Sequence, residues 1–182
     1  EFKIDPDIAV FAKAVSNGYP MSVILGTEEV MQSAQSTFIS STYWTERIGP
    51  TAAIATIQKF MEKDVSSHLN EIGNQIQKIW KECAAAHDLD IHVSGLPALS
   101  HFSFNYTDGQ AMMTLFVQLM LARGILASNR FYASYAHEKE NVDEYKVACD
   151  DVFSEIKDAI EKDELDKVLL GPVAQSGFKR LN

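Results

Sequence analysis

The sequence contains little cysteine and no concentrated positive charge. Only two of its 182 residues are cysteines, Cys83 and Cys149, and they lie far apart in the chain. This usage is typical of a reduced, cytoplasmic protein and not of a chain held together by disulfides. The formal net charge is −9, and no block of lysine and arginine occurs. Nucleic acid and anionic membranes are therefore not expected as partners.

Long apolar runs and metal-binding spacings are also missing. No apolar run approaches the roughly 20 residues that cross a membrane, and no signal peptide is visible. The five histidines show neither an HExxH motif nor a Cys/His ligand spacing, so no metal site is expected. Glycine-rich nucleotide loops of the GxGxxG or Walker type do not occur.

The most informative stretch places one lysine between two apolar segments. Ile8–Ala12 predicts a strand that ends at Lys13, a turn cluster follows at Ser16–Pro20, and Met21–Leu25 predicts a second strand. A lysine in a low-dielectric pocket has a lowered pKa, and its free amine can condense with a carbonyl. The alternative is a surface lysine that ends a strand, because most lysines are exposed.

The rest of the chain predicts a mixed α/β fold. We expect, in order, a helix at 28–35, a strand at 37–42, a helix from Gly49-Pro50 to His87 with a kink near Asp64 or Ser66, strands at 91–97 and 98–104, a helix at 110–123, a strand region at 125–134 interrupted at 128–130, and a helix at 142–162 capped from Asn141. Inward-facing stripes are expected at Ile72, Ile76, Ile79 and Trp80, and at Val147, Val152, Ile156 and Ile160.

One loop combines large aromatic side chains with charge. Tyr43-Trp44 is followed by Thr45-Glu46-Arg47. Aromatic and charged residues together on a loop suggest a functional site or an interface. The alternative is a contact at the rim of an ordinary core.

Several segments together resemble a known enzyme family. Pro6-Asp7-Ile8, Phe11–Ala14 and Asn17–Pro20 look like the cofactor-lysine segment of class III aminotransferases. These are fold-type I enzymes that use pyridoxal 5′-phosphate (PLP), and they include the glutamate-1-semialdehyde 2,1-aminomutases. The resemblance implies that residues 1–63 form the C-terminal edge of a large PLP-binding domain and residues 64–182 a small C-terminal α+β domain. The chain begins at Glu1-Phe2 and enters a strand at once, so we interpret it as the C-terminal part of a longer enzyme.

The resemblance also assigns the cofactor residues. Lys13 matches the lysine that forms a Schiff base with PLP and then carries a proton. Ser41-Thr42 falls where the family has a Gly-Thr pair whose threonine hydrogen-bonds the phosphate of the neighbouring subunit, which implies a homodimer. Here Tyr43–Arg47 replaces a Leu-Ser-Gly-Asn-Pro type of stretch. The alternative for Thr42 is a hydroxyl that satisfies backbone at the end of a strand.

Two C-terminal features complete the resemblance. Ala133–His137, followed by Asn141–Asp143, resembles the family's Ser-x-Ala-His segment before the last helix, and we interpret it as support for the fold. Arg130 lies where some relatives hold a substrate carboxylate, for which a guanidinium is a natural bidentate partner. The alternative is an exposed loop arginine.

The expected activity is transfer of an amino group between an amino donor and a carbonyl acceptor through pyridoxamine phosphate, as in an aminotransferase, or its return to a neighbouring carbon, as in an aminomutase. In the family the phosphate loop, the ring-stacking aromatic and the pyridine carboxylate all precede the lysine. We therefore expect this chain alone to bind PLP weakly or not at all, to have no turnover, and to expose interface surface at residues 38–54. The rival hypothesis is a non-enzymatic, acidic α/β interaction domain in which Lys13 is structural.

Overall fold

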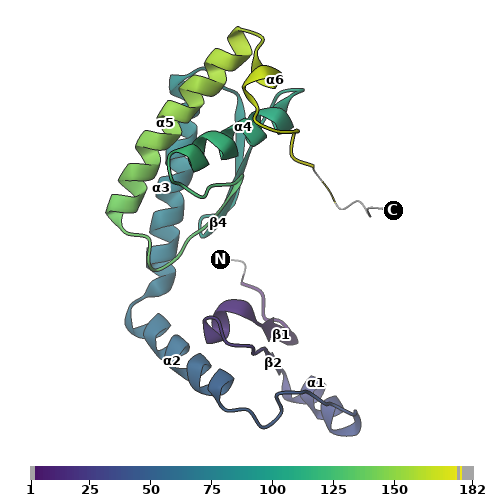
Figure 1. The fold of residues 1–182 in the computed structure, drawn as a ribbon. Coiled ribbons are helices and arrows are strands. Elements are labelled where there is room, and N and C mark those ends of the chain that lie inside the picture. Colours follow the sequence, from purple (N-terminus) through teal and green to yellow (C-terminus); the bar gives the residue numbers. More distant parts are fainter. Residues whose placement is uncertain (1–2, 176, 178–182) are drawn as a thin grey trace. The chain divides into compact units, whose positions relative to one another are not determined.

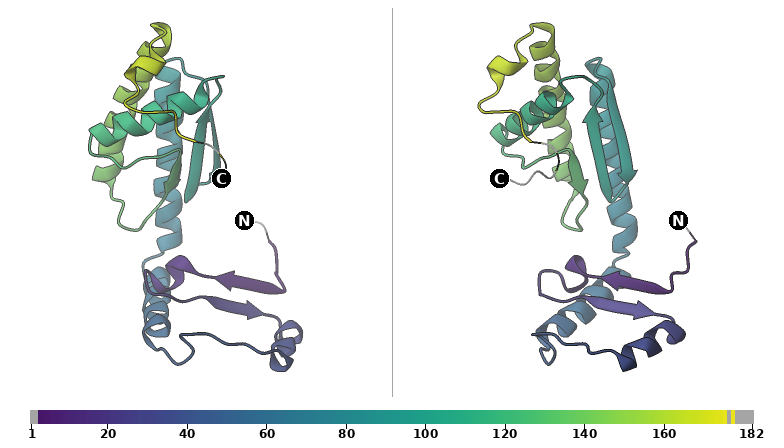
Figure 2. Two further views of the ribbon diagram at one scale, coloured as in Figure 1. Left: turned by 45° about the vertical axis from the view of Figure 1, so that its right-hand side comes forward. Right: turned by 90° about the vertical axis from the view of Figure 1, so that its right-hand side faces the viewer.

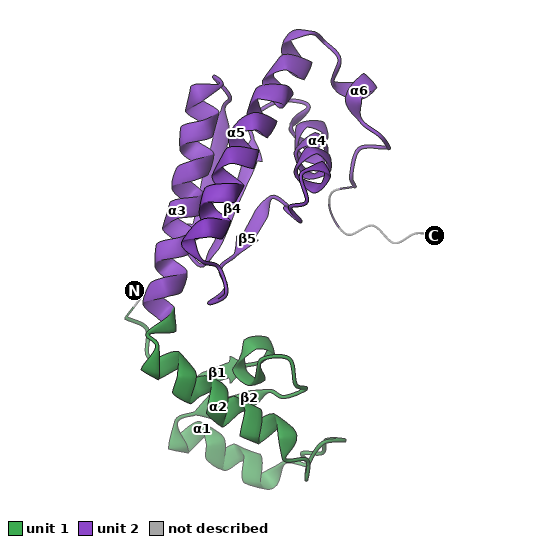
Figure 3. Ribbon diagram, turned by 60° about the vertical axis from the view of Figure 1, so that its left-hand side comes forward, with its two compact units in different colours: residues 1–65 green, residues 66–182 purple. Residues whose placement is uncertain are grey.

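The chain divides into two compact units. The computed structural model describes residues 3–175 and residue 177. Residues 1–65 make up unit 1 and residues 66–182 make up unit 2 (Figure 3).

Unit 1 is built on a two-stranded antiparallel sheet. Strands β1 (Ile8–Phe11) and β2 (Val23–Gly26) pair from Ile8↔Gly26 to Phe11↔Val23. The 3₁₀ helix η1 (Lys13–Ser16) lies between them in the chain, and helix α1 (Glu28–Gln32), the 3₁₀ helix η2 (Ser33–Ser36) and helix α2 (Ile48–Glu62) follow (Figure 1). The two predicted strands and the helix at Gly49-Pro50 are confirmed.

The predicted strand at residues 37–42 is wrong. The structure has a loop there after η2, because hydroxyl groups satisfy the local backbone. Ser36 Oγ donates to the Ser33 carbonyl at 3.0 Å and Thr37 Oγ1 donates to the Ala34 carbonyl at 3.0 Å. Such side-chain hydrogen bonds stabilise a turn in competition with a strand.

The predicted long helix is two helices. Helix α2 ends at Glu62 and helix α3 (Val65–Ala86) begins after Asp64, whose φ of +44° lies in the left-handed region. Aspartate tolerates this region better than most residues. The break therefore falls at one of the two positions at which the sequence predicted a kink.

Unit 2 packs helices against a three-stranded antiparallel sheet. The sheet order is β3 (Ile91–Leu96), β4 (Leu99–Phe104) and β5 (Arg130–Tyr132), with Ser94↔His101 and Ser100↔Phe131 among the paired residues. Helix α4 (Gly109–Ala122) follows β4, helix α5 (Lys139–Glu161) follows β5, and the short helix α6 (Leu165–Val168) comes last. Helices α3 and α5 run side by side (Figures 1 and 2).

The core of unit 2 is aromatic. Phe102 on β4 is buried, and its ring centroid lies 4.8 Å from that of Trp80, 5.2 Å from that of Phe116 and 6.0 Å from that of Phe153. Together these four side chains join β4 to α3, α4 and α5. The predicted stripe at Ile72, Ile76, Ile79 and Trp80 is confirmed, since all four are buried.

Predictions near the last helix need correction. Helix α5 begins at Lys139, three residues before the predicted start, and Asn141 Oδ1 accepts a hydrogen bond from the Glu138 N–H at 2.9 Å. Val147, expected to face inward, is 64% exposed, whereas Val152 and Ile156 are buried. Residues 125–127 form no strand. Short apolar runs predict burial better than they predict which element forms.

Candidate functional site

Lys13 lies one residue beyond β1, after Ala12, and begins the turn that returns the chain to β2. Ala12 is extended, with φ −149°, and Lys13 has a φ of +55°. A left-handed backbone is uncommon for a residue other than glycine, asparagine or aspartate and costs of order 1–3 kcal/mol. Such outliers gather at functional sites, although the backbone alone does not single out Lys13, because Lys3 has a φ of +47°.

The turn after Lys13 is fixed from inside. Asn17 has a φ of +47° and Gly18 a φ of +105°. Ser16 is buried, and its hydroxyl donates to the Tyr19 carbonyl. These residues hold the backbone that presents Lys13. The sequence marked the cluster as a turn but gave no sign that Ser16 would be its buried anchor.

The side chain of Lys13 is exposed. No hydrogen bond or ion pair joins its amine to another residue in the part of the chain that the structure describes. The expected low-dielectric pocket is therefore not formed around Lys13 by the described residues. Burial of this amine needs additional protein surface.

Ser41 and Thr42 lie in an exposed turn between η2 and α2. Ser41 Oγ accepts a hydrogen bond from the Tyr43 N–H at 3.3 Å. The loop leads into α2, whose second residue, Gly49, is buried. A Cβ placed on Gly49 would lie 3.2 Å from Met21 Cβ and 3.3 Å from the Pro20 carbonyl oxygen. The start of α2 therefore packs against the end of the turn that carries Lys13.

Glu46 caps helix α2. Its carboxylate accepts hydrogen bonds from the N–H groups of Ile48 and Gly49, the second at 2.9 Å. The bonds from Gly49 and Ile48 lower the pKa of Glu46, because backbone donors favour the charged carboxylate. They also occupy N–H groups of the first turn of α2, so this helix end does not offer them to another anion.

Unit 1 exposes much of its hydrophobic surface. Phe38 is 95% exposed and Trp44 is 69% exposed, and among its described hydrophobic residues only Ala53 and Val65 are buried. The exposure of Trp44 does not fit the alternative of a contact at the rim of an ordinary core within this chain. Exposed apolar surface on this scale marks an interaction surface.

Arg130 lies in unit 2, on β5 opposite His101. It is exposed, and its guanidinium forms no ion pair with a described residue. Its backbone N–H donates to Ser128 Oγ at 3.0 Å, and the Ser128 hydroxyl donates to the Arg130 carbonyl at 3.0 Å. Arg130 borders two cavities of unit 2, of about 670 and 320 Å³.

The segment predicted to support the fold does so through His137. Its Nδ1 accepts a hydrogen bond from the Ser134 N–H at 2.9 Å, and its backbone carbonyl lies 3.0 Å from His68 Nε2 on α3. Desolvation, with a smaller contribution from His68, lowers the pKa of His137. The segment therefore ties the start of α5 to α3.

Other expectations can be compared with the described residues. Both cysteines are free and buried in the core of unit 2. In the described ranges no helix is long and apolar enough to cross a membrane, and no three or more histidine, cysteine, aspartate or glutamate residues gather as a metal site would require.

The fold is shared with solved transaminase structures. The FumI protein of Sphingopyxis sp. MTA144, in its PLP internal aldimine form, matches with a TM-score of 0.80 at 23% sequence identity, over 87% of this chain and 39% of that protein. A transaminase with PLP bound matches with a TM-score of 0.75 at 20% identity, over 86% of this chain and 40% of that protein. The fold is therefore that of the C-terminal portion of these fold-type I enzymes.

The chain belongs to the class III aminotransferase family, since the family model described as Aminotransferase class-III matches residues 1–153. Among curated relatives, 3-aminobutyryl-CoA aminotransferase of Cloacimonas acidaminovorans is 25% identical over 86% of this chain and 39% of its own length. Glutamate-1-semialdehyde 2,1-aminomutase of Natronomonas pharaonis is 31% identical over 60% of this chain and 25% of its own length. The chain thus spans about two fifths or less of the length of these two relatives.

Proposed function

We propose that this chain is the lysine-bearing C-terminal part of a PLP-dependent class III aminotransferase or glutamate-1-semialdehyde aminomutase-like enzyme. The observation that carries the proposal is Lys13, which has a left-handed backbone at the end of β1, inside the segment that matches the family. The same proposal assigns residues 1–63 to the edge of a large PLP-binding domain and residues 64–182 to a small domain. The division of the structure after residue 65 supports this assignment.

The residues present fit part of a PLP site. The cofactor has an aldehyde, a phosphate and a pyridine ring, each of which needs a partner. The exposed amine of Lys13 suits the aldehyde, and the exposed hydroxyls of Ser41 and Thr42 suit the phosphate. Glu46 already accepts hydrogen bonds from N–H groups at the start of α2. The hydroxyls of Ser41 and Thr42 are therefore better candidates for binding the phosphate than those N–H groups.

Each residue has one chemical task in this proposal. When bound, PLP supplies a carbonyl for amine exchange and a ring that withdraws electrons. Lys13 would hold the cofactor through its side-chain amine and, when that amine is free, would carry a proton as a general base and acid. Arg130 binds a substrate carboxylate through its planar guanidinium.

The exposed hydrophobic surface of unit 1 supports a larger assembly. The proposal places residues 38–54 against other parts of the enzyme or a second subunit, with Thr42 reaching the phosphate in the neighbouring active site. The reactants are an amino donor and a carbonyl acceptor. Incubating the longer enzyme with an amino donor, with and without a keto acid, separates the two activities, because only an aminomutase completes turnover without the acceptor.

Covalent trapping tests the role of Lys13. The longer enzyme is incubated with PLP, reduced with borohydride and mapped by peptide mass spectrometry, and we expect one pyridoxyl group on Lys13. Lys3 is a matched control, since it is also exposed and has a φ of +47°. The variant Lys13→Ala should lose the label and Lys3→Ala should keep it. Label scattered over surface lysines would support the non-enzymatic interaction domain instead.

A further inference from the structure

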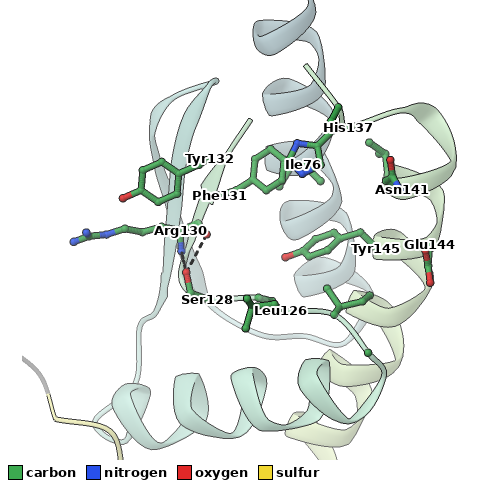
Figure 4. Close-up of a pocket in the computed structure, with 15 residues that line it drawn as sticks. Ile76, Leu126, Ser128, Arg130, Phe131, Tyr132, His137, Asn141, Glu144 and Tyr145 are labelled. Carbon is green, nitrogen blue, oxygen red and sulfur yellow. Dashed lines mark hydrogen bonds between the residues drawn. The ribbon is translucent and has the colours of Figure 1, made fainter. Parts of the chain in front are cut away.

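A cavity of about 670 Å³ lies within unit 2. It is bounded by α3, residues 124–128, β5 and the first turns of α5 (Figure 4). Ile76 and Phe131 give it apolar walls, and Leu126, which is 91% exposed, lies on its margin. Its volume lies inside the range of about 300–1,000 Å³ that is typical of small-molecule sites.

Tyr145 brings a hydrogen-bond donor to this cavity. Its hydroxyl oxygen accepts the Trp80 Nε1–H at 2.8 Å, while its own hydrogen has no acceptor among the residues that the structure describes. Figure 4 shows the hydroxyl directed into the cavity. Burial raises the pKa of Tyr145, so the group stays a neutral donor at physiological pH.

His137 brings a second donor to the wall. Because its Nδ1 accepts the Ser134 N–H at 2.9 Å, the neutral ring carries its proton on Nε2. Its ring centroid lies 5.0 Å from that of Phe131, which fixes the ring against the apolar wall. The lowered pKa of His137 keeps the imidazole neutral at pH 7.

These donors select the kind of ligand. We propose that the cavity binds a small molecule that has a neutral carbonyl oxygen on an apolar body. The carbonyl oxygen accepts a hydrogen bond from the hydroxyl of Tyr145. An anion is disfavoured, because both donors are neutral, Glu144 is on the lining, and the guanidinium of Arg130 points away from the cavity (Figure 4). Nothing in this proposal depends on the role of Lys13.

A free small molecule fits better than an added peptide strand. β5 borders the cavity. A peptide strand could pair with the free edge of β5 only if backbone N–H and carbonyl groups of β5 had no other hydrogen-bond partner. The N–H and carbonyl of Arg130 are already bound to the hydroxyl of Ser128, both at 3.0 Å. The edge is therefore blocked at Arg130, whereas the hydroxyl proton of Tyr145 remains available.

The indole signals of the 182-residue chain report binding. The chain has two tryptophans, so an amide nitrogen–proton NMR spectrum shows two indole N–H peaks. Trp80 is bonded to Tyr145, whereas Trp44 is 69% exposed and lies in unit 1. N-butylbenzamide is the probe, because an amide does not condense with lysine. We expect a saturable shift of the Trp80 peak and none of the Trp44 peak.

Two matched ligands and two matched variants test the chemistry. Butylbenzene lacks the carbonyl and 4-butylbenzoate carries a charge, and both should bind at least fivefold more weakly than the amide. Tyr145→Phe should weaken amide binding about fivefold to tenfold, the loss of one neutral hydrogen bond. Tyr132→Phe, whose hydroxyl is exposed at the rim (Figure 4), should not change it.

Three results would overturn the proposal. The first is no saturable shift of Trp80. The second is equal affinity for the amide and for butylbenzene, which would leave an unselective apolar cavity. The third is binding to the 182-residue chain that disappears in the longer enzyme, because a carbonyl from another part of the protein would then occupy the site in place of a ligand. Binding in both forms, lost in Tyr145→Phe, supports a free-ligand site.

Discussion

Helix α3 meets the β3–β4 turn at a position where only glycine fits. A Cβ built on Gly73 would lie 1.8 Å from the Pro97 carbonyl oxygen and 2.2 Å from its carbonyl carbon. Both neighbours are backbone atoms, so the turn and the helix would have to separate by about 1.6 Å to restore a normal contact. The substitution Gly73→Ala tests how strongly this contact holds unit 2 together.

The magnitude follows from two opposing effects. Alanine favours a helix interior over glycine by about 1 kcal/mol. Overpacking typically costs about 1–3 kcal/mol, and more when backbone must move. Separation also strains the bonds of buried Ser100, whose hydroxyl donates to the Pro97 carbonyl at 2.8 Å and accepts from Gln77 Nε2 at 2.8 Å. We expect a net loss of about 2 kcal/mol, with Tm lower by about 4–8 °C.

Urea unfolding followed by far-ultraviolet circular dichroism measures this loss. Gly171→Ala is the matched control, because a Cβ on Gly171 has no atom within 4 Å, and it should change stability by less than about 0.5 kcal/mol. If Gly73→Ala is as stable as wild type, or more stable, the close contact does not exist in solution and the packing of α3 on the turn is wrong.

Three further predictions concern unit 1. Hydrogen bonds from Gly49 and Ile48 lower the pKa of Glu46 below its ordinary 4.5, so wild type should be more stable than Glu46→Gln at neutral pH. The difference between their urea midpoints should fade as the pH falls below 4.5, because the carboxylate becomes protonated. A difference that stays constant with pH would contradict this prediction. The wild-type chain should self-associate in sedimentation experiments. The double variant Phe38→Ser, Trp44→Ser should shift the equilibrium toward the monomer. A wild-type chain that is monomeric at all concentrations would show that the exposed surface is not an interface. Mixed with PLP, the 182-residue chain should show no persistent visible absorption band, and a band abolished by Lys13→Ala would refute the view that the described residues form an incomplete site.

Much of the fold was predictable from local pattern. The spacing of Ile72, Ile76, Ile79 and Trp80 predicted the buried face of α3, and all four are buried. A period of 3.6 residues records which side of a helix faces the core, whatever it packs against. The change to alternating residues likewise predicted β3 and β4 within one or two residues of their ends.

Local pattern failed where side chains compete with the backbone. Residues 37–42 are β-branched and hydroxyl-rich, yet the hydroxyls of Ser36 and Thr37 bond the preceding turn instead. Val147 belongs to an apolar spacing but lies outside the stripe that faces the core. In both places the decisive partner was a backbone carbonyl or a neighbouring element, which composition does not specify.

The candidate sites divide in the same way. The sequence by itself determined the lysine, the turn after it and the likeness to the aminotransferase family, because strand, turn residue and functional side chain are consecutive in the chain. Only the tertiary structure decided that Trp80 bonds Tyr145 across 65 positions and that His68 Nε2 meets the backbone carbonyl of His137 across 69 positions. A hydrogen bond between distant elements requires their packing to bring donor and acceptor within about 3 Å, and no spacing along the chain encodes that distance.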